Sequence, residues 1–325
     1  MKAKLYSTFV ALGAVMFTQF FCNAFGEEPV AQVELERSAN LRDWERVPVT
    51  GDMLTEDGKI RLPAEGSAGF FRLTIETDVP APEMVLVEGG TMPEESPEFG
   101  GEDVASFEIG RYPVTWSEWK VVREWGADNG YDIGDVGEGC ADDHPVHSVN
   151  WYDVVKWCNA RSEMEKLTPV YTVGGEVYRE GDFGAEGSDV VDWNSLADGY
   201  RLPREVEWEF AARGGNESRG YTYSGSNDLD EVGWYRENSV GAECIQSNDR
   251  GTWPVGKKEP NEIGLYDMSG NVSEWCWDEW ESRRRIRGGS WSLDDIYCTV
   301  WFSGVPEPDF RHIIYGFRLV RSSLD

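Results

Sequence analysis

One stretch near the C-terminal end constrains the fold and the chemistry of this chain more than any other. Residues 264–275 read GLYDMSGNVSEW, and eight successive positions hold the carboxylates of Asp267 and Glu274, the carboxamide of Asn271 and the flexible Gly270. Glycine accepts positive φ because it lacks a Cβ, so the stretch predicts a tight turn. Oxygen ligands on such a turn suit Ca²⁺. The same spacing is typical of an Asx-type turn with a solvated carboxylate, and spacing alone favours this simpler interpretation.

The stretch belongs to a series of motifs that follow one another in a fixed order. They are MVLVEGG at 84–90, YPVTWSEW at 112–119, HPVHSVNWYDVVKWCN at 144–159, LTPVYT at 167–172, YRLPREVEWEFAARGG at 200–215, RGGSW at 287–291 and GFRLVR at 316–321. Together these motifs resemble the sulfatase-modifying-factor family, the domain of formylglycine-generating enzymes, over about residues 84–323. The resemblance implies an α+β fold related to C-type lectins and rich in irregular structure. It also implies a calcium site formed by Asp267, Gly270, Val272 and Glu274.

Local signals predict three helices in this part of the chain. Thr115 and Glu118 form a capping box before the first helix, Asn150 caps the second, which runs from Trp151 to about residue 166, and the third begins near residue 204. We expect one core-facing side of the first helix to carry Trp116, Trp119, Val122 and Trp125. The 36 glycines and 15 tryptophans of the chain are typical of irregular structure held together by aromatic packing.

The N-terminus predicts export. Residues 1–26 have a positive start, an apolar run and an Ala-Phe-Gly exit, which is the pattern of a cleaved signal peptide. An uncleaved membrane anchor is the alternative, but polar residues within the run favour cleavage. We therefore expect a secreted or periplasmic protein with no stable membrane insertion after cleavage. Cleavage removes two lysines and no acids, so the net charge changes from −30 to −32. Such a charge argues against nucleic-acid partners.

The remainder divides into two predicted domains. Residues 27–79 contain two alternating segments separated by turn residues, which predicts a small β-rich module. The Pro-rich, acidic TDVPAPE follows as a linker, and residues 80–325 form the large domain. The sequence has no G-x-S-x-G, P-loop or dinucleotide-binding fingerprint.

The resemblance also identifies where catalysis would occur. Enzymes of the family oxidise a cysteine of a sulfatase peptide to formylglycine, using O₂ and a copper ion held by two cysteine thiolates. Ser290, Tyr297 and Cys298 match active-site positions of this chemistry, but Leu293 stands at the first copper-binding cysteine and Asp294 at the histidine that follows. A leucine offers no lone pair, and one thiolate holds Cu(I) far more weakly than two.

The expected function follows from this substitution. We expect a non-catalytic or functionally diverged member that binds a peptide, a protein or a glycan, with Trp291 and Trp301 lining the binding cleft. The alternative is a copper-dependent oxidoreductase that converts a sulfatase cysteine to formylglycine. That alternative needs a substitute ligand, for which Cys276 or Cys244 are the candidates by position.

The remaining cysteines add one further candidate site. Cys140, His144 and His147 have a C-x₃-H-x₂-H spacing that could suit zinc. The resembled family has an HPV stretch here without zinc, so a structural role is favoured. Five cysteines remain after cleavage, and an odd number leaves at least one thiol free or paired between chains.

Overall fold

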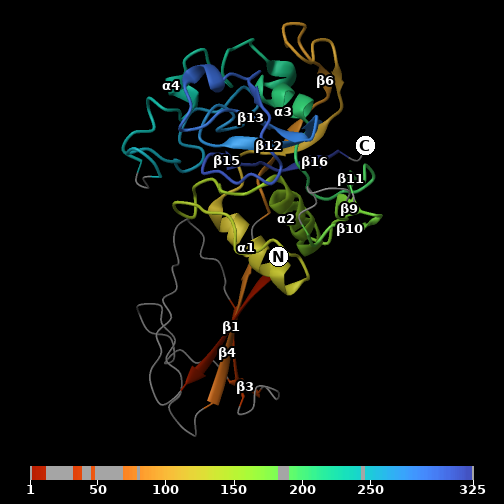
Figure 1. Ribbon diagram of the computed structural model, residues 1–325, viewed down its shortest axis with the longest axis vertical. Coiled ribbons are helices and arrows are strands. Elements are labelled where there is room, and N and C mark those ends of the chain that lie inside the picture. Colours follow the sequence, from red (N-terminus) through yellow and green to blue (C-terminus); the bar gives the residue numbers. More distant parts are fainter. Residues whose placement is uncertain are drawn as a thin grey trace. The chain divides into compact units, whose positions relative to one another are not determined.

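The chain forms two compact units, Met1–Ala81 and Pro82–Asp325 (Figure 1). The computed structural model describes residues 2–11, 32–38, 45–47, 69–78, 81–181, 190–242 and 246–323. The predicted cleavage site at residues 24–26 therefore lies outside the described residues.

The first unit is built on a four-stranded antiparallel sheet with the order β1-β4-β2-β3. Its strands are β1 (Lys2–Ala11), β2 (Gln32–Ser38), β3 (Glu45–Val47) and β4 (Gly69–Asp78). β2 and β4 correspond to the two alternating segments seen in the sequence. β1 pairs with all of β4, and it lies inside the predicted signal peptide. A chain cleaved after residue 26 would lack this strand.

The second unit mixes helices with short strands. Its helices are α1 (Trp116–Asp128), α2 (Trp151–Met164), α3 (Glu205–Ala212) and α4 (Leu229–Val232), with 3₁₀ turns at Gly215–Glu217 and Asp295–Tyr297. Its strands are β5 (Met84–Val87), β6 (Gly90–Thr91), β7 (Asp103–Val104), β8 (Phe107–Gly110), β9 (Tyr171–Val173), β10 (Glu176–Val177), β11 (Val191–Trp193), β12 (Ser273–Trp280), β13 (Arg283–Arg287), β14 (Ser303–Gly304), β15 (Tyr315–Gly316) and β16 (Val320–Ser322). This composition confirms the expected α+β class.

The strands of this unit form small sheets around a central one. The central sheet has the order β14-β13-β12-β15, in which β12 runs antiparallel to β13 and parallel to β15. Further sheets have the orders β16-β8-β5, β10-β9-β11 and β6-β7. α1 packs against α2, and α3 packs against β12 and β13 (Figure 1). The motifs on β12 and β13 thus lie at the centre of the unit.

The predicted helix starts are confirmed. Thr115 and Glu118 form a reciprocal capping box, and Asn150 does the same with Asp153. The predicted core face of α1 is only partly right. Trp119 and Val122 are buried, but Trp116 and Trp125 are half-buried. Each three-residue step falls about 60° short of a full helical turn, so four such positions spread around the helix.

The core is rich in aromatic rings, as the composition predicts. The fully buried tryptophans are Trp119, Trp151, Trp157, Trp208, Trp275 and Trp291. Trp119 stacks on Trp157 with ring centroids 5.8 Å apart, and Phe317 meets both rings edge-on. Large rings that interlock in this way supply much apolar burial to a fold with short elements.

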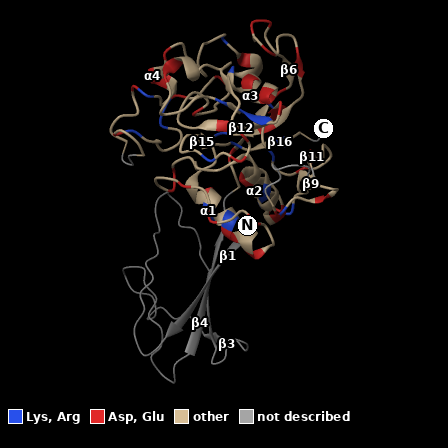
Figure 2. Cartoon of the chain, viewed as in Figure 1, with Lys and Arg blue, Asp and Glu red and all other residues tan. Residues whose placement is uncertain are grey.

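The surface of the second unit is acidic. Figure 2 shows Asp and Glu on α4 and on the loops beside β6, with Lys and Arg interspersed. In the part of the chain that the structure describes, no helix combines the length and the apolar character needed to cross a bilayer.

Candidate functional site

Two loops of the C-terminal third lie against each other at one end of the central sheet. The backbone N–H of Gly270 donates to the carbonyl of Gly288 (2.7 Å), and that of Trp291 donates to Asn271 (3.0 Å). The strands that continue from these loops pair so that Glu274 of β12 is opposite Arg287 of β13. The GLYDMSGNVSEW and RGGSW motifs therefore form one structural unit.

The first loop has the tight turn that its sequence predicts. Asp267, Gly270 and Asn271 have φ values of 56°, 92° and 60°. A Cβ on Gly270 would lie 2.2 Å from the carbonyl oxygen of Trp234, so this position requires glycine on steric grounds as well. The strained turn brings the side chains of Asp267 and Asn271 together, and the carboxamide donates to the Asp267 carboxylate at 3.2 Å.

The carboxylate of Glu274 is buried and paired. Arg318 donates to both of its oxygens at 2.7 Å, and the indole N–H of Trp208 donates to one of them, also at 2.7 Å. Both charged side chains are completely shielded from solvent. Arg318 also donates to the carbonyls of Gly110 and Tyr266, so this ion pair ties β8 and the first loop to β12.

The carboxylate of Asp267 is also buried, but its hydrogen-bond donors are neutral. They are the backbone N–H of Gly256 (2.8 Å) and the carboxamide of Asn271. Burial raises the pKa of Asp267 to about 6, against the weaker opposing effects of these donors and of the nearby Arg318. A cation bound at Asp267 would favour the ionised form of this buried carboxyl group.

The predicted calcium ligands fit the ion in part. The side-chain hydrogen bonds of Asp267 come from neutral donors, so its carboxylate oxygens lack a directly bonded counter-charge, which suits a hard cation. Glu274 is already neutralised by Arg318. No three His, Cys, Asp or Glu side chains are grouped to hold a metal ion in the described ranges, so calcium here would depend on carbonyl oxygens.

A second buried ionic cluster supports the other motif, and sequence reasoning missed it. Arg287 donates to Glu205 of α3 (2.8 Å) and pairs with Glu209 (3.1 Å), and Arg285 pairs with the other oxygen of Glu205 (3.1 Å). Arg287 is fully buried. Arg287 at the start of the RGGSW motif was the available signal, because an arginine that is buried with its motif needs acidic partners.

The second loop places Cys298 in apolar surroundings. Its side chain is completely buried and packs in a cluster with Leu229, Val232 and Tyr235. Burial raises the pKa of the Cys298 thiol to about 12, although a backbone hydrogen bond from Ser290 opposes the shift. The thiol therefore stays protonated at neutral pH, and a protonated, buried thiol is a poor nucleophile and a poor metal ligand.

These surroundings do not fit a copper pair. Cys276, a candidate substitute ligand, lies in a different core cluster with Trp208 and Val206, while Cys244 lies outside the described residues. Leu293 stands at the position that the resemblance assigns to the first copper-binding cysteine. The apolar cluster around Cys298 contains no second sulfur, so it lacks the pair of thiolates that would hold Cu(I).

The predicted aromatic surface is smaller than expected. Trp301 and Tyr297 are exposed, at 41% and 37%, and Ile296 beside them is 63% exposed. Trp291, in contrast, is a core residue with 1% exposure, because its backbone bonds to Asn271 and its ring packs inside the unit. Ser290 is buried as well. The exposed large apolar side chains near Cys298 in the sequence are therefore Ile296, Tyr297 and Trp301, which we call the exposed patch.

The possible zinc ligands have other partners. Cys140 is disulfide-bonded, so its sulfur cannot also serve as a thiolate ligand. His144 Nδ1 lies 3.0 Å from the hydroxyl of Thr252, and His147 contacts Gln246. Burial lowers the pKa of His147 to about 4, which keeps the ring neutral. The structural interpretation of this spacing holds for Cys140.

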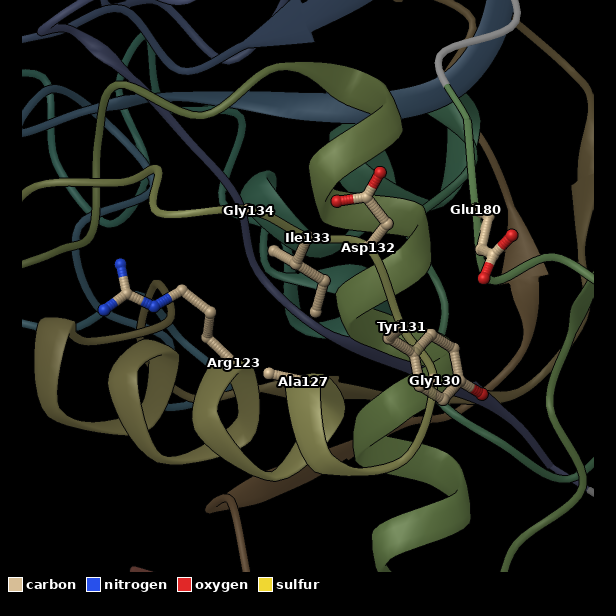
Figure 3. Close-up of a pocket in the computed structure, with 8 residues that line it drawn as sticks. All are labelled: Arg123, Ala127, Gly130, Tyr131, Asp132, Ile133, Gly134 and Glu180. Atoms are coloured by element: carbon tan, nitrogen blue, oxygen red, sulfur yellow. The ribbon is translucent and has the colours of Figure 1, made fainter. Parts of the chain in front are cut away.

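A hollow of about 380 Å³ lies elsewhere, between α1 and the segment that follows it. Figure 3 shows Arg123 and Ala127 of α1 on one side, Tyr131 and Asp132 on the loop, and Glu180 at the rim. The Arg123 guanidinium donates to the carbonyl of Val136 and pairs with Asp135. Its charge is therefore already compensated, and the hollow shares no residue with the predicted site.

The chain belongs to the sulfatase-modifying-factor family, since residues 71–323 match the sulfatase-modifying factor enzyme 1-like domain. It is 38% identical over 263 residues to the chaperone protein LppX of Paenibacillus barcinonensis, and the alignment covers 74% of this chain and 89% of that protein. It is 38% identical over 168 residues to the formylglycine-generating enzyme of Thermomonospora curvata, covering 41% of this chain and 55% of the enzyme. The crystal structure of CarF matches 75% of this chain and 100% of its own with a TM-score of 0.64 and 28% identity. These similarities confirm the expected family and fold.

Proposed function

We propose that this chain is a non-catalytic member of its family that binds another polypeptide through the exposed patch of Ile296, Tyr297 and Trp301. The observation that carries the proposal is the state of Cys298, whose thiol is buried among apolar side chains and kept protonated. An oxidase of this family would need that sulfur as a metal ligand. The neighbouring surface keeps exposed aromatic rings, which are the residues that anchor protein interfaces.

The name of one relative supports a polypeptide over a glycan as the ligand. The Paenibacillus barcinonensis protein, which this chain matches along most of its length, is named a chaperone. Exposed aromatic and aliphatic side chains next to each other suit the apolar segments of an incompletely folded protein. The proposed site is exported with the chain and stabilised by calcium at Asp267.

Binding can be measured with a reduced, carboxymethylated model protein as the unfolded polypeptide. Fluorescence titration should show saturable binding, and Trp301→Ala and Tyr297→Ala should each weaken it by about tenfold, because aromatic anchors dominate such interfaces. Trp280→Ala is the matched control, since Trp280 is also exposed (51%) but belongs to β12. Equal losses in all three variants, or no binding by the wild type, would refute the proposed surface.

The oxidase alternative has its own decisive test. The purified protein is incubated with Cu(I), O₂, an excess of a thiol reductant that supplies the two further electrons, and a sulfatase-type cysteine peptide, and the peptide is examined by mass spectrometry. We expect no conversion of the cysteine to the aldehyde. Conversion above the copper-only background would replace the binding proposal with catalysis.

A further inference from the structure

The N-terminal unit contains a strand whose partner is removed if the signal peptide is cleaved. β4 has two neighbours, β1 on one edge and β2 on the other. β1 pairs with it from Lys2 opposite Asp78 to Ala11 opposite Gly69, which is its full length. β1 also lies entirely within the predicted signal peptide. Cleavage after residue 26 would therefore leave β4 as an edge strand.

The freed edge is long and has few of the features that protect edge strands. β4 spans ten residues, GFFRLTIETD, and its register with β1 is continuous. Edge strands of stable monomers are normally short, interrupted by a bulge, or protected by proline or lysine. β4 contains neither proline nor lysine, and its charged residues, Arg72, Glu76 and Asp78, include both signs, so they do not by themselves repel a second copy of the strand. A row of unpaired backbone groups of this length is a template for another strand.

The sequence of β4 is complementary to itself in one antiparallel register. A two-fold axis at Thr74 places Arg72 opposite Glu76 of the partner subunit, and Glu76 opposite Arg72 of the partner subunit. The same register sets Leu73 opposite Ile75 and Thr74 opposite its own counterpart. Opposite-charge, aliphatic and Thr–Thr pairs are the cross-strand combinations that stabilise antiparallel sheets. Strand alternation also puts Phe71, Leu73 and Ile75 on one face, which continues across such a junction.

We propose that removal of the signal peptide exposes β4 and that two copies of the mature chain then pair through β4 in this register, forming a continuous sheet with two-fold symmetry. The dimer uses the same patch on both copies, as a two-fold interface must. The proposal goes beyond the binding function of the second unit and is independent of the patch at Trp301. It depends on cleavage of residues 1–26.

The test uses the exported chain with its natural N-terminus. Mass spectrometry first establishes where the mature chain begins, and light scattering coupled to size exclusion then gives its mass at 0.15 M salt, where the repulsion between the acidic copies is screened. We expect a start at residue 27 and a dimer. An uncleaved chain, or a monomer at tens of micromolar, overturns the proposal.

Charge reversal identifies the interface. Arg72→Glu sets two glutamates opposite each other twice, and Glu76→Arg sets two arginines opposite each other twice, so each should raise the dissociation constant roughly tenfold or more. Mixing these two variants restores both opposite-charge pairs, and a heterodimer should form. Arg46→Glu on β3, at the far edge of the sheet, carries the same change in net charge and should leave the dimer intact. Circular dichroism checks that each variant is folded.

The outcomes separate this idea from its rivals. Dimers that persist in both single variants place the interface elsewhere, and loss of the dimer in Arg46→Glu indicates a general charge effect. Failure of the mixed variants to associate, with each single variant monomeric and folded, refutes the two-fold register at Thr74. None of these outcomes depends on whether the second unit binds an unfolded polypeptide.

Discussion

The two loops at the end of the central sheet differ in the surroundings of their buried functional groups. The loop with Asp267 and the first residues of β12 bury two carboxylates, Asp267 and Glu274, which receive hydrogen bonds from Arg318, Asn271 and the backbone. The thiol of Cys298 packs against apolar side chains of α4 and Tyr235, while Asp294 and Asp295 of the same loop reach solvent. Buried ions are retained as complete sets, because removing one member strands the others. A lone thiol carries no such penalty, since a protonated cysteine packs as a small apolar group.

The comparison predicts its largest effect at Arg318. Arg318→Met leaves the buried Glu274 carboxylate without its counter-charge, and the free energy of unfolding should fall by about 3–5 kcal/mol in urea denaturation. Arg236→Met removes the exposed pair with Asp294 and should change it by less than about 1 kcal/mol. Similar losses in both variants would mean that burial of the first pair does not matter.

A smaller loss is expected from the turn itself. Gly270→Ala forces an alanine into positive φ and a contact with the Trp234 carbonyl, so stability should fall by about 3 kcal/mol. Gly130→Ala is the control, because Gly130 has φ 81° but nothing within 4 Å of an added Cβ. It should cost only about 1 kcal/mol. Equal costs would show that the loop yields to the added methyl group.

Asp267 sharpens the comparison through its pH dependence. The pKa of its carboxyl is raised to about 6 in the folded chain, whereas the unfolded value is near 4. The folded state therefore holds the proton more tightly, and the stabilisation from this proton is complete below pH 4. Without calcium, stability should fall by about 2 kcal/mol as pH rises from 4 to 6. Calcium should abolish this fall, because it favours the carboxylate.

Asp267→Asn provides the control for this titration. The variant should lose both the pH-dependent step and the stabilisation by calcium, measured as urea midpoints in EDTA and in millimolar calcium. If calcium stabilises the variant as strongly as the wild type, the ion binds elsewhere. If it stabilises neither, the calcium proposal fails while the pH step remains interpretable.

The smallest effect is expected at Cys298. Cys298→Ala removes one buried sulfur from an apolar cluster and should cost about 1–2 kcal/mol while leaving polypeptide binding unchanged within twofold. The native thiol should also resist iodoacetamide at pH 8 and react only after unfolding, because its pKa is near 12. Rapid labelling of the folded chain at Cys298 would contradict the apolar description of this loop.

The sequence predicts the parts of this fold that depend on neighbours along the chain. The starts of α1 and α2 follow from Thr115 and Asn150, whose capping partners lie three residues on. The turn at Gly270 is equally local. The order of the motifs along the chain predicted the family and the α+β class, and the matched domain confirms the family.

The sequence did not reveal partners that meet only in space. Glu274 and Arg318 are 44 positions apart, and Arg287 meets Glu205 across 82. Trp291 was expected on the surface, because its neighbours in the motif suggested a cleft, yet it packs inside. The apolar cover of Cys298 comes from Leu229 and Val232, far upstream, so the state of its thiol needed the three-dimensional structure.

The distribution of sulfur in the second unit has a consequence for handling the protein. Cys140 is bonded, and the three other described cysteines, Cys158, Cys276 and Cys298, are free and sealed in the interior. The native chain therefore tolerates an oxidant at these three positions. When the chain unfolds in the same medium, all three thiols become exposed and can exchange with the disulfide of Cys140. Denaturation under oxidising conditions is therefore irreversible unless a reductant is present.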